Sequence, residues 1–457
     1  MNDNPLIGGL RRVRALVMPA SDRAPALSSK QLSQLRQQLR ECAQGTGGEV
    51  SARLRAVRLG ETYLRLDDAG RHEFLRLIAL EFGPDAKRVA KAHEAYQQAV
   101  GTSGQWDAES GLRAALRSSR IRILTQLNAL PQGVKFLVDL RADLLRYLDG
   151  DLGLAALDRE LEARLTAWFD VGFLELQRIT WNSPAVLLEK LIHYEAVHEI
   201  RSWADLKNRL DSDRRLYAFF HPRMPMEPLI FVEVALTDKL ADNVQTLLDE
   251  SAPVFDARRA DTAIFYSISN TQAGLRGVSF GNFLLKRVID DLKRDFPRLK
   301  TFATLSPLPQ LRRWAEKNPE AVGQAFAETE RRRLHTLGVE PDAARLCVLL
   351  ATPDWHNDVA LARALRDPLS KLAARYLLQA SSSNRPYDPV ARFHLGNGAR
   401  IERINWLGDT SAKGLGQSYG LMVNYLYDPE AIEANVEAFV AAGHIAAAAG
   451  VRRKTKT

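Results

Sequence analysis

FYSISNTQAGLRGVSFGNFLLKRVIDDLKRDFPRLKTFATLSPLP, residues 265–309, contains two strand-like runs with a helical pattern between them. The runs FYSIS and KTFATLSP are rich in β-branched and aromatic residues, as strands are. Between them, apolar residues recur every three or four positions and predict an amphipathic helix: Leu285, Val288, Ile289, Leu292 and Phe296. Strand, helix and strand in this order predict a mixed α/β unit.

The loop before this helix is rich in glycine. Gly274, Gly277 and Gly281 let the backbone turn closely, and Arg276 adds positive charge. Backbone N–H groups in such a loop, together with the positive end of the helix dipole, can hold a pyrophosphate. The glycines can equally serve only to form a turn, and the loop by itself leaves both interpretations open.

The rest of the chain changes character once. Helical patterns separated by short breakers extend from about residue 28 to 178, and beyond residues 182–184 strand-like runs alternate with helical patterns: LYAFFHP, PLIFVEVAL, AIFYSIS, FATLSP and RLCVLLA. The sequence therefore predicts an α+β, two-domain chain, in which an all-helical bundle precedes a mixed α/β domain. We expect a flexible arm at 1–27, a helical domain at 28–183, a mixed domain at 184–450 and a basic tail at 451–457.

The composition is that of a globular protein. The 457 residues are 46% hydrophobic and 26% charged, and the formal net charge is +8. The positive charge favours an anionic partner. Zinc-finger spacing, an RNP-type pattern of aromatic and basic residues and a clear helix-turn-helix are all missing from the sequence, so we expect no nucleic acid partner.

Cysteine usage and hydropathy bear on location. Only Cys42 and Cys347 are present, which argues against disulfides and cysteine-based metal sites and suits a reducing compartment. No apolar run approaches the roughly 20 residues that span a bilayer, and the N-terminus has no continuous signal-peptide core. We therefore expect a cytoplasmic protein with no membrane partner.

Residues 277–281 read Gly-Val-Ser-Phe-Gly and match the G-x-S-x-G nucleophile elbow of serine hydrolases, with Ser279 as the nucleophile. His394 lies downstream with several acids between, in the chain order of such a triad. An elbow requires a strand that runs directly into the serine, whereas the strand predicted here ends near Ser269 and NTQAGLR follows it. A serine acyl-CoA thioesterase is therefore an alternative that the local context disfavours.

His394 lies in DPVARFHLGNGARIERINWLGD, residues 388–409. It belongs to an apolar, strand-like run and precedes Gly396 and Gly398, where the backbone can turn. The imidazole can be a packing residue beside a hairpin turn, or a proton donor held in place by that turn. The local sequence favours the packing interpretation.

These segments resemble known families. The loop is similar to the acyl-CoA loop of GNAT-type N-acetyltransferases, Q/R-x-x-G-x-G/A, with Ser279 where the middle glycine belongs. Malonyl-CoA decarboxylases are similar in motif order over residues 60–430, and the segments that carry this resemblance are HPRMPMEPLIFVEVALT, FYSISNTQAGLRGVSFGNFLLKRV, FATLSPLPQLRRW, DPVARFHLGNGARIERINWLGD and GLMVNYLY. The resemblance implies a helical domain that forms a homo-oligomer, a dimer or tetramer, and a catalytic domain with an acetyltransferase-like fold.

The resemblance also implies an activity, the conversion of malonyl-CoA to acetyl-CoA and CO2 in fatty acid metabolism, without a metal, cofactor or prosthetic group. By motif, the serine that contacts the malonyl group is Ser306 of LSPLP, and the proton donor is His394 of FHLGNG. The acyl-CoA loop corresponds to Arg276, Gly277, Val278, Ser279, Phe280, Gly281 and Asn282. Some relatives carry Glu in place of Ser279, so a role for that carboxylate does not transfer. A CoA-dependent acyltransferase, which the fold alone suggests, is a further alternative.

The reaction needs particular side chains. Loss of CO2 leaves a thioester enolate, which requires hydrogen-bond donors at its oxygen and a proton at its α-carbon. Pro307 favours an extended Ser306 that can orient the malonyl group, although the same residues can also form a helix-start turn. An imidazolium of His394 with the usual pKa of about 6.5 can deliver the proton.

Other polar residues are candidates for contact with the substrate. Asn397 can bind the enolate oxygen, although an Asn between glycines is as often only a turn residue. Tyr419 can contact the substrate or the histidine. Tyr425 and Tyr427 are also candidates, but their alternate spacing fits an ordinary strand face better.

Overall fold

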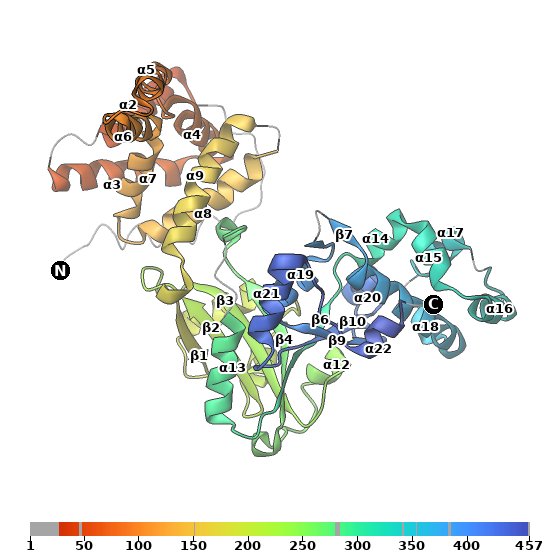
Figure 1. Ribbon diagram of the computed structural model, residues 1–457. Helices are drawn as coiled ribbons and strands as arrows, with labels where there is room; N and C mark the ends of the chain where they lie inside the picture. Colours follow the sequence, from red (N-terminus) through yellow and green to blue (C-terminus); the bar gives the residue numbers. More distant parts are fainter. Residues whose placement is uncertain are drawn as a thin grey trace. The chain divides into compact units, whose positions relative to one another are not determined.

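The computed structural model describes residues 27–44, 48–149, 151–278, 284–340, 342–352, 354–382 and 385–455. The chain forms two compact units: residues up to Leu165 with Gly274–Arg276, and Thr166–Ala273 with the chain from Gly277 onward (Figure 1). We expected the division near residue 183. It lies earlier in the structure, because strand β1 (Glu175–Ile179) pairs with β2 in the sheet of the second unit.

The first unit is helical, as predicted. Its helices are α2 (Ser29–Gln44), α3 (Glu49–Arg65), α4 (Asp68–Glu81), α5 (Ala86–Ala99), α6 (Gln105–Leu116), α7 (Arg120–Asn128), α8 (Gly133–Tyr147) and most of α9 (Leu152–Trp168). Asp67 and Asp85 cap α4 and α5, since their carboxylates accept backbone N–H groups of the first turn. The apolar stripe of α8 is buried, as its spacing predicts, at Leu137, Leu140 and Leu144.

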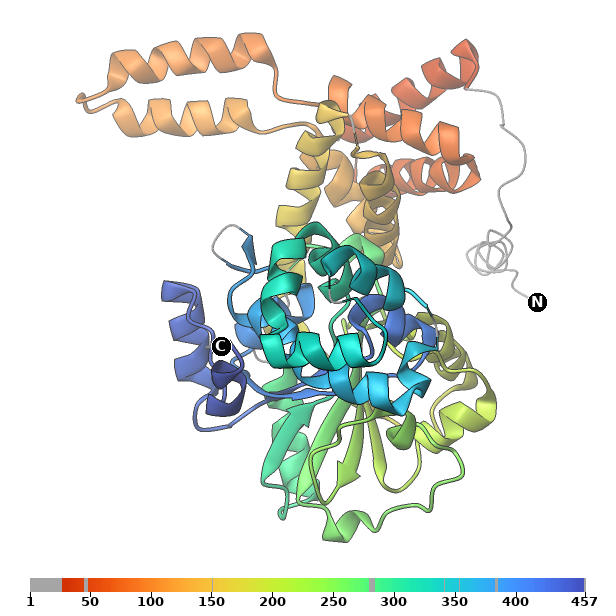
Figure 2. The same cartoon turned by 90° about the vertical axis from the view of Figure 1, so that its right-hand side faces the viewer.

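Helices α5 and α6 form a hairpin within this unit. Figure 2 shows them as two antiparallel helices lying side by side. Every residue of α5 is at least partly exposed, and Trp106 at the start of α6 is 74% exposed. The hairpin therefore buries little apolar surface of its own, and it presents large apolar side chains to solvent.

The second unit contains a mixed eight-stranded sheet. Its strands are β1, β2 (Arg214–Phe220), β3 (Pro228–Thr237), β4 (Thr262–Asn270), β5 (Thr301–Thr304), β6 (Ser306–Pro307), β9 (Arg400–Asn405) and β10 (Met422–Leu426). Their order is β1-β2-β3-β4-β5-β10-β6, with β9 also paired to β10. β4 and β5 run parallel, and the other described pairs of this sheet are antiparallel.

Helix α13 (Leu284–Asp295) connects β4 to β5 and buries the apolar stripe that its sequence predicts. The other helices of this unit are α10 (Ala185–Tyr194), α11 (Trp203–Arg209), α12 (Val244–Leu247), α14 (Leu311–Lys317), α15 (Pro319–Ala325), α16 (Glu328–Thr336), α17 (Ala343–Leu349), α18 (Val359–Leu378), α19 (Pro389–Gly396), α20 (Ala412–Ser418), α21 (Ile432–Ala442) and α22 (Ala449–Arg453). A small separate sheet pairs β7 (Ser381–Ser382) with β8 (Arg385–Pro386). A helical part followed by a mixed α/β part confirms the predicted fold class.

The sheet has a gap beside the second half of β4. β4 pairs with β5 only as far as Phe265, which lies opposite Thr304. Beyond this point β4 continues to Asn270 with β3 as its partner among the described strands. A bulge at Tyr266 interrupts the β3–β4 register at the same place. Within the described ranges, the β5 side of β4 therefore has no neighbouring strand there.

One predicted strand is a helix. The run RLCVLLA lies mainly in α17 (Ala343–Leu349). Leu346 in this helix and Leu350 directly after it are buried, whereas Val348 is 71% exposed. In a strand Leu346, Val348 and Leu350 would share one face, so the exposure of Val348 between two buried leucines fits a helix. A short apolar run does not by itself distinguish the two structures.

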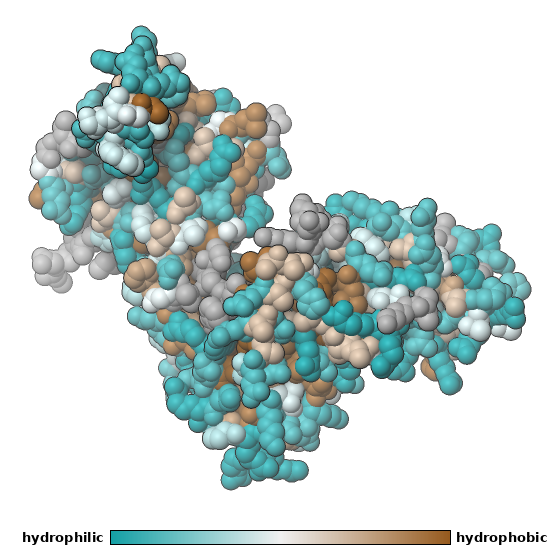
Figure 3. All heavy atoms as spheres, viewed as in Figure 1, coloured by the Kyte–Doolittle hydropathy of each residue, from teal (hydrophilic) through white to brown (hydrophobic). Residues whose placement is uncertain are grey.

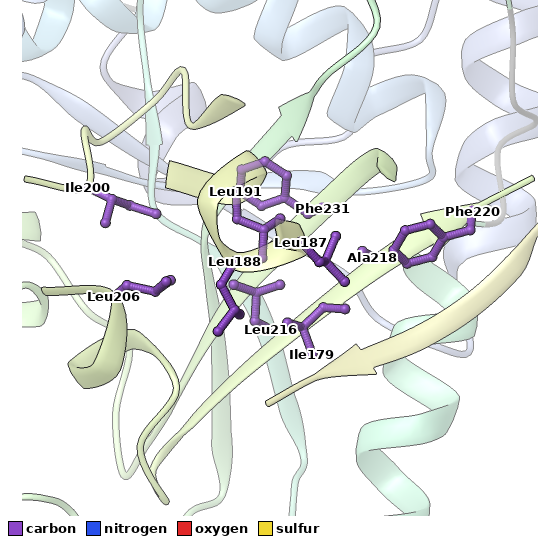
Figure 4. Close-up of a cluster of buried hydrophobic side chains, with 10 residues drawn as sticks. All are labelled: Ile179, Leu187, Leu188, Leu191, Ile200, Leu206, Leu216, Ala218, Phe220 and Phe231. Carbon is purple, nitrogen blue, oxygen red and sulfur yellow. The ribbon is translucent and has the colours of Figure 1, made fainter. Parts of the chain in front are cut away.

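A hydrophobic cluster fixes α10 and α11 on the sheet (Figure 4). It consists of Ile179, Leu187, Leu188, Leu191, Ile200, Leu206, Leu216, Ala218, Phe220 and Phe231. The face of the molecule drawn in Figure 3 is mostly hydrophilic, with hydrophobic residues in scattered patches. Across the residues that the structure describes, no helix is both long enough and apolar enough to cross a bilayer.

Candidate active site

Ser306 begins β6 and lies opposite Val423 of β10. Its hydroxyl lies 2.8 Å from the Thr304 hydroxyl and 3.0 Å from Nε2 of His394. Thr304 is fully buried, and its side-chain oxygen also accepts the backbone N–H of Tyr425. The Ser306 hydroxyl is therefore held from two sides at the start of β6.

His394 lies in helix α19, not in a strand-like run as the sequence suggested. Asp388 caps this helix by accepting two backbone N–H groups of the first turn, and Pro389 occupies the first turn. The predicted turn follows directly, where Gly398 has a φ of +83°. The cap accepts backbone N–H groups that have no partner inside the helix, and the proline favours the first helical turn. These two residues therefore decide the local structure, which the apolar pattern alone does not reveal.

Burial lowers the pKa of His394 from its ordinary value of 6.5 to about 3. The side chain is 2% exposed, and desolvation is the cause of the shift. We expected an imidazolium with an ordinary pKa. The structure instead holds a neutral imidazole at neutral pH, because the apolar surroundings disfavour the charged form.

Two tyrosines fix the imidazole ring. Nδ1 of His394 lies 2.8 Å from the hydroxyl of Tyr427, and the ring of Tyr425 stacks on the imidazole with centroids 4.4 Å apart. Burial raises the pKa of both phenols, so both stay protonated. A phenol that donates to Nδ1 keeps the imidazole proton on Nε2, the nitrogen that faces Ser306. We call Thr304, Ser306, His394 and Tyr427 the hydroxyl–imidazole network.

A cavity of about 210 Å³ opens beside this network. It lies at the gap between β4 and β5, and its lining residues are Val197, Phe265, Tyr266, Ile268, Asn270, Leu305, Ser306, Pro307, Pro389, Val390, Phe393 and His394. Most of this lining is apolar. Hydrogen bonds to a developing charge are stronger in such surroundings than in water.

The predicted acyl-CoA loop is described only in part. Outside the described residues lie Ser279, Phe280, Gly281 and Asn282. Gly277 has a φ of +87°, a conformation that favours glycine, and Val278 is buried. Within the first unit, Arg141 donates to the carbonyls of Gly274 and Arg276 at 2.9 and 2.7 Å, while the Arg276 side chain is exposed.

Asn397 and Tyr419 are not among the described residues that line the cavity. Asn397 ends α19, and its amide donates to the carbonyl of Phe393. Tyr419 is buried at the end of α20 with a φ of +57°. Their contacts with substrate stay predictions.

Thr304 is a site residue that we missed in the sequence, although its spacing from Ser306 could have identified it. Thr304 precedes Ser306 by two residues in a strand-like run, and this spacing places two side chains on one face. Val197, in contrast, lies in an irregular segment between α10 and α11 that matches no motif. In the part of the chain that the structure describes, no group of three His, Cys, Asp or Glu residues is placed to hold a metal ion.

Known proteins resemble this chain along most of its length. The family profile of the malonyl-CoA decarboxylase C-terminal domain matches residues 172–457, and that of the N-terminal domain matches residues 82–169. The mitochondrial malonyl-CoA decarboxylase of Anser anser anser is 38% identical over 404 residues, which cover 84% of this chain and 80% of the relative. Crystal structures of the malonyl-CoA decarboxylases from Rhodopseudomonas palustris and Agrobacterium vitis are each 42% identical and cover 93% of this chain and 100% of theirs, with TM-scores of 0.84 and 0.83.

Proposed function

The chain belongs to the malonyl-CoA decarboxylase family, whose members are carboxy-lyases, and we propose that Ser306 and His394 carry out its conversion of malonyl-CoA to acetyl-CoA and CO2. The observation that carries this proposal is the 3.0 Å contact between Ser306 Oγ and His394 Nε2 at the wall of the cavity. The two residues are 88 positions apart in the chain, and no other pair of candidate residues comes together at the described part of this cavity.

The gap between β4 and β5 suits the pantetheine arm of the substrate. Beyond Phe265 the inner side of β4 has no strand partner among the described residues. Pantetheine carries amide groups that can hydrogen-bond to such a strand much as a peptide does. An arm bound in this way reaches the cavity with its thioester, and residues 276–282 with the start of α13 are left to hold the CoA phosphates.

Ser306 then orients the malonyl group. Its hydroxyl donates to Thr304 in the free protein and turns its proton to the malonyl carboxylate when the substrate binds, which holds the bond to be broken perpendicular to the thioester plane. As this C–C bond breaks, its electron pair passes onto the α-carbon and the thioester oxygen, and CO2 leaves.

His394 supplies the proton. The α-carbon takes the proton from Nε2 to form acetyl-CoA, and water restores one proton to the imidazole in each turnover. The substrate carboxylate brings negative charge into the cavity, which raises the pKa of His394 in the complex above its value in the free protein. In the imidazolium both ring nitrogens carry a proton, so the Tyr427 oxygen accepts the Nδ1 proton and the Nε2 proton faces the substrate.

The remaining predictions about partners and location belong to this proposal. The scheme uses no cofactor. The exposed apolar side chains of the α5–α6 hairpin support a homo-oligomer, a dimer or tetramer, formed through the helical domain. A cytoplasmic location stays a prediction, since the relative from Anser anser anser is named as mitochondrial.

The proposal is tested by a product assay. The purified protein, given malonyl-CoA and no acceptor, should release acetyl-CoA and CO2 in equal amounts. Free malonate and CoA as products would indicate the thioesterase, and a requirement for an amine acceptor would indicate the acyltransferase.

Two serine variants assign the role of Ser306. Ser306→Ala should lower turnover by roughly 10²-fold, as loss of a donor to a reacting group does. Ser279→Ala is the matched control and should be mild, because position 279 belongs only to the proposed phosphate loop. Severe loss at 279 with a harmless change at 306 would reverse the assignment.

A further inference from the structure

We propose that Val197 sets the size of the α-substituent that the enzyme accepts, so that malonyl thioesters are favoured over α-alkylated ones. This inference rests on the proposed function and names a specificity-determining residue for the same cavity. It depends on where Val197 lies and on how its backbone is held.

Val197 separates two cavities. It lines the 210 Å³ cavity that contains Ser306 and His394. It also lines a second cavity of about 560 Å³, together with Glu189, Ile192, His193, Glu195, Ala196, Glu199, Ile200 and Lys413. It is the only residue common to the two sets of lining residues in the described chain. A smaller side chain at this position therefore enlarges the cavity that contains Ser306 and His394, because it opens that cavity toward the second one.

The backbone around Val197 is fixed although it is neither helix nor strand. We call residues 195–199 the wall segment. The carboxylate of Glu195 accepts the backbone N–H groups of Val197 and His198, each at 2.7 Å. The same carboxylate accepts the hydroxyls of Ser267 and Ser269 of β4, at 2.8 and 3.2 Å. The wall segment is therefore tied to the strand that borders the reacting groups.

Cationic side chains hold the carbonyls of the wall segment. Lys413 donates to the carbonyls of Ala196 and Val197 at 2.7 and 2.9 Å. Arg209, which is 1% exposed, donates to the carbonyls of the next two residues at 2.9 and 3.0 Å. Four consecutive carbonyls are thus engaged, so the Val197 side chain cannot move aside without the loss of charge-assisted hydrogen bonds.

A fixed apolar wall discriminates by volume. One additional methyl or methylene group changes the selectivity of an apolar pocket by roughly 10- to 200-fold. A rigid wall reaches the upper part of this range, because it does not relax around the larger group. The chemical class of substrate that follows is an unbranched malonyl thioester, with methylmalonyl and ethylmalonyl thioesters as poor substrates.

The test compares kcat/KM for malonyl-CoA, methylmalonyl-CoA and ethylmalonyl-CoA. The wild-type enzyme should prefer malonyl-CoA over methylmalonyl-CoA by at least tenfold. Val197→Ala should narrow this preference by tenfold or more, and Val197→Ile should widen it. Thermal unfolding of each variant establishes that it is folded.

Val390→Ala is the matched control, since Val390 is a valine of the same cavity that is absent from the lining of the second one. It should change the ratio by less than twofold. Lys413→Met should narrow the preference by a few-fold through movement of the wall segment, and Lys413→Arg should restore it.

The outcomes are distinct. A wild-type enzyme that forms no acetyl-CoA from malonyl-CoA overturns the proposed function. A wild-type enzyme that decarboxylates all three esters equally well overturns only the role of Val197. An unchanged ratio in folded Val197→Ala, or an equal change in Val390→Ala, also overturns it.

Discussion

The hydroxyl–imidazole network and the wall segment border the same cavity, yet opposite kinds of interaction hold them. Hydroxyl groups and a stacked ring hold His394, and burial lowers its pKa to about 3. The wall segment is held by Glu195, Lys413 and Arg209, all of them charged side chains. Neutral contacts leave the pKa of the imidazole open to change by a charge that enters the cavity, whereas charged contacts fix the shape of the wall segment.

The ion pairs of Arg209 extend from the wall segment to the centre of the sheet. Arg209 donates to Asp205 at 2.8 Å and to Glu233 of β3 at 3.0 Å. Burial raises the pKa of Glu233 to about 8, which the Arg209 charge opposes. A single guanidinium therefore contacts two carboxylates and two carbonyls, and its five donors suit such a task better than an ammonium group would.

The largest effect is expected at the imidazole. His394→Asn should lower kcat for malonyl-CoA by roughly 10²–10⁴-fold, because the proton donor is lost, while KM changes only a few-fold. Steady-state kinetics measure both parameters. His221→Asn is the control: His221 is also a buried histidine of the second unit, but its imidazole contacts the Trp168 carbonyl and does not line the cavity. Near-normal turnover by His394→Asn would remove the imidazole from the mechanism.

The next effect is on stability. Arg209→Met should lower the free energy of unfolding by about 3–5 kcal/mol, since buried carboxylates lose their partner. Urea denaturation measures the change. Arg201→Met provides the comparison, because Arg201 also pairs with Asp205 but is 68% exposed, and its loss should cost less than about 1 kcal/mol. Equal effects of the two variants would show that burial does not distinguish these arginines.

The smallest effect is a pH dependence of stability. Below pH 6.5 the unfolded chain protonates His394, whereas the folded chain does so only near pH 3, so the unfolded state binds more protons between these values. Stability from this group is therefore lost as pH falls. Between pH 7 and pH 5 the free energy of unfolding of the wild type should fall by about 2 kcal/mol more than that of His394→Asn. Parallel urea-denaturation results for the two proteins would place the pKa of His394 near its ordinary value.

Much of the architecture was predictable from short-range pattern. The helical first unit, strands β2 to β5 and helix α13 follow from apolar spacing and breakers, since each is decided within about ten residues of sequence. The pattern gave the wrong structure for RLCVLLA and for the run before His394. In both segments a short apolar stretch fits a buried helix as well as a strand, and only capping or tertiary packing decides.

The site was less predictable than the fold. Ser306 and His394 were identified through the family resemblance, because their 3.0 Å contact joins positions 88 residues apart. The lowered pKa of His394 depends on a burial that no local pattern encodes. Lys413 holds the backbone carbonyl of Val197 from more than 200 positions away in the chain, and no local sequence pattern predicts such a contact.

The gap beside β4 gives this sheet a third edge, in its interior. An unpaired strand edge in the open invites another chain to add to it, and proteins normally blunt such edges. Here the edge faces a cavity whose other lining comes from residues 305–307, α19 and Val197 of the wall segment. An edge inside the sheet can serve the proposed binding of an amide-bearing arm with less aggregation risk than an outer edge of the same composition would carry.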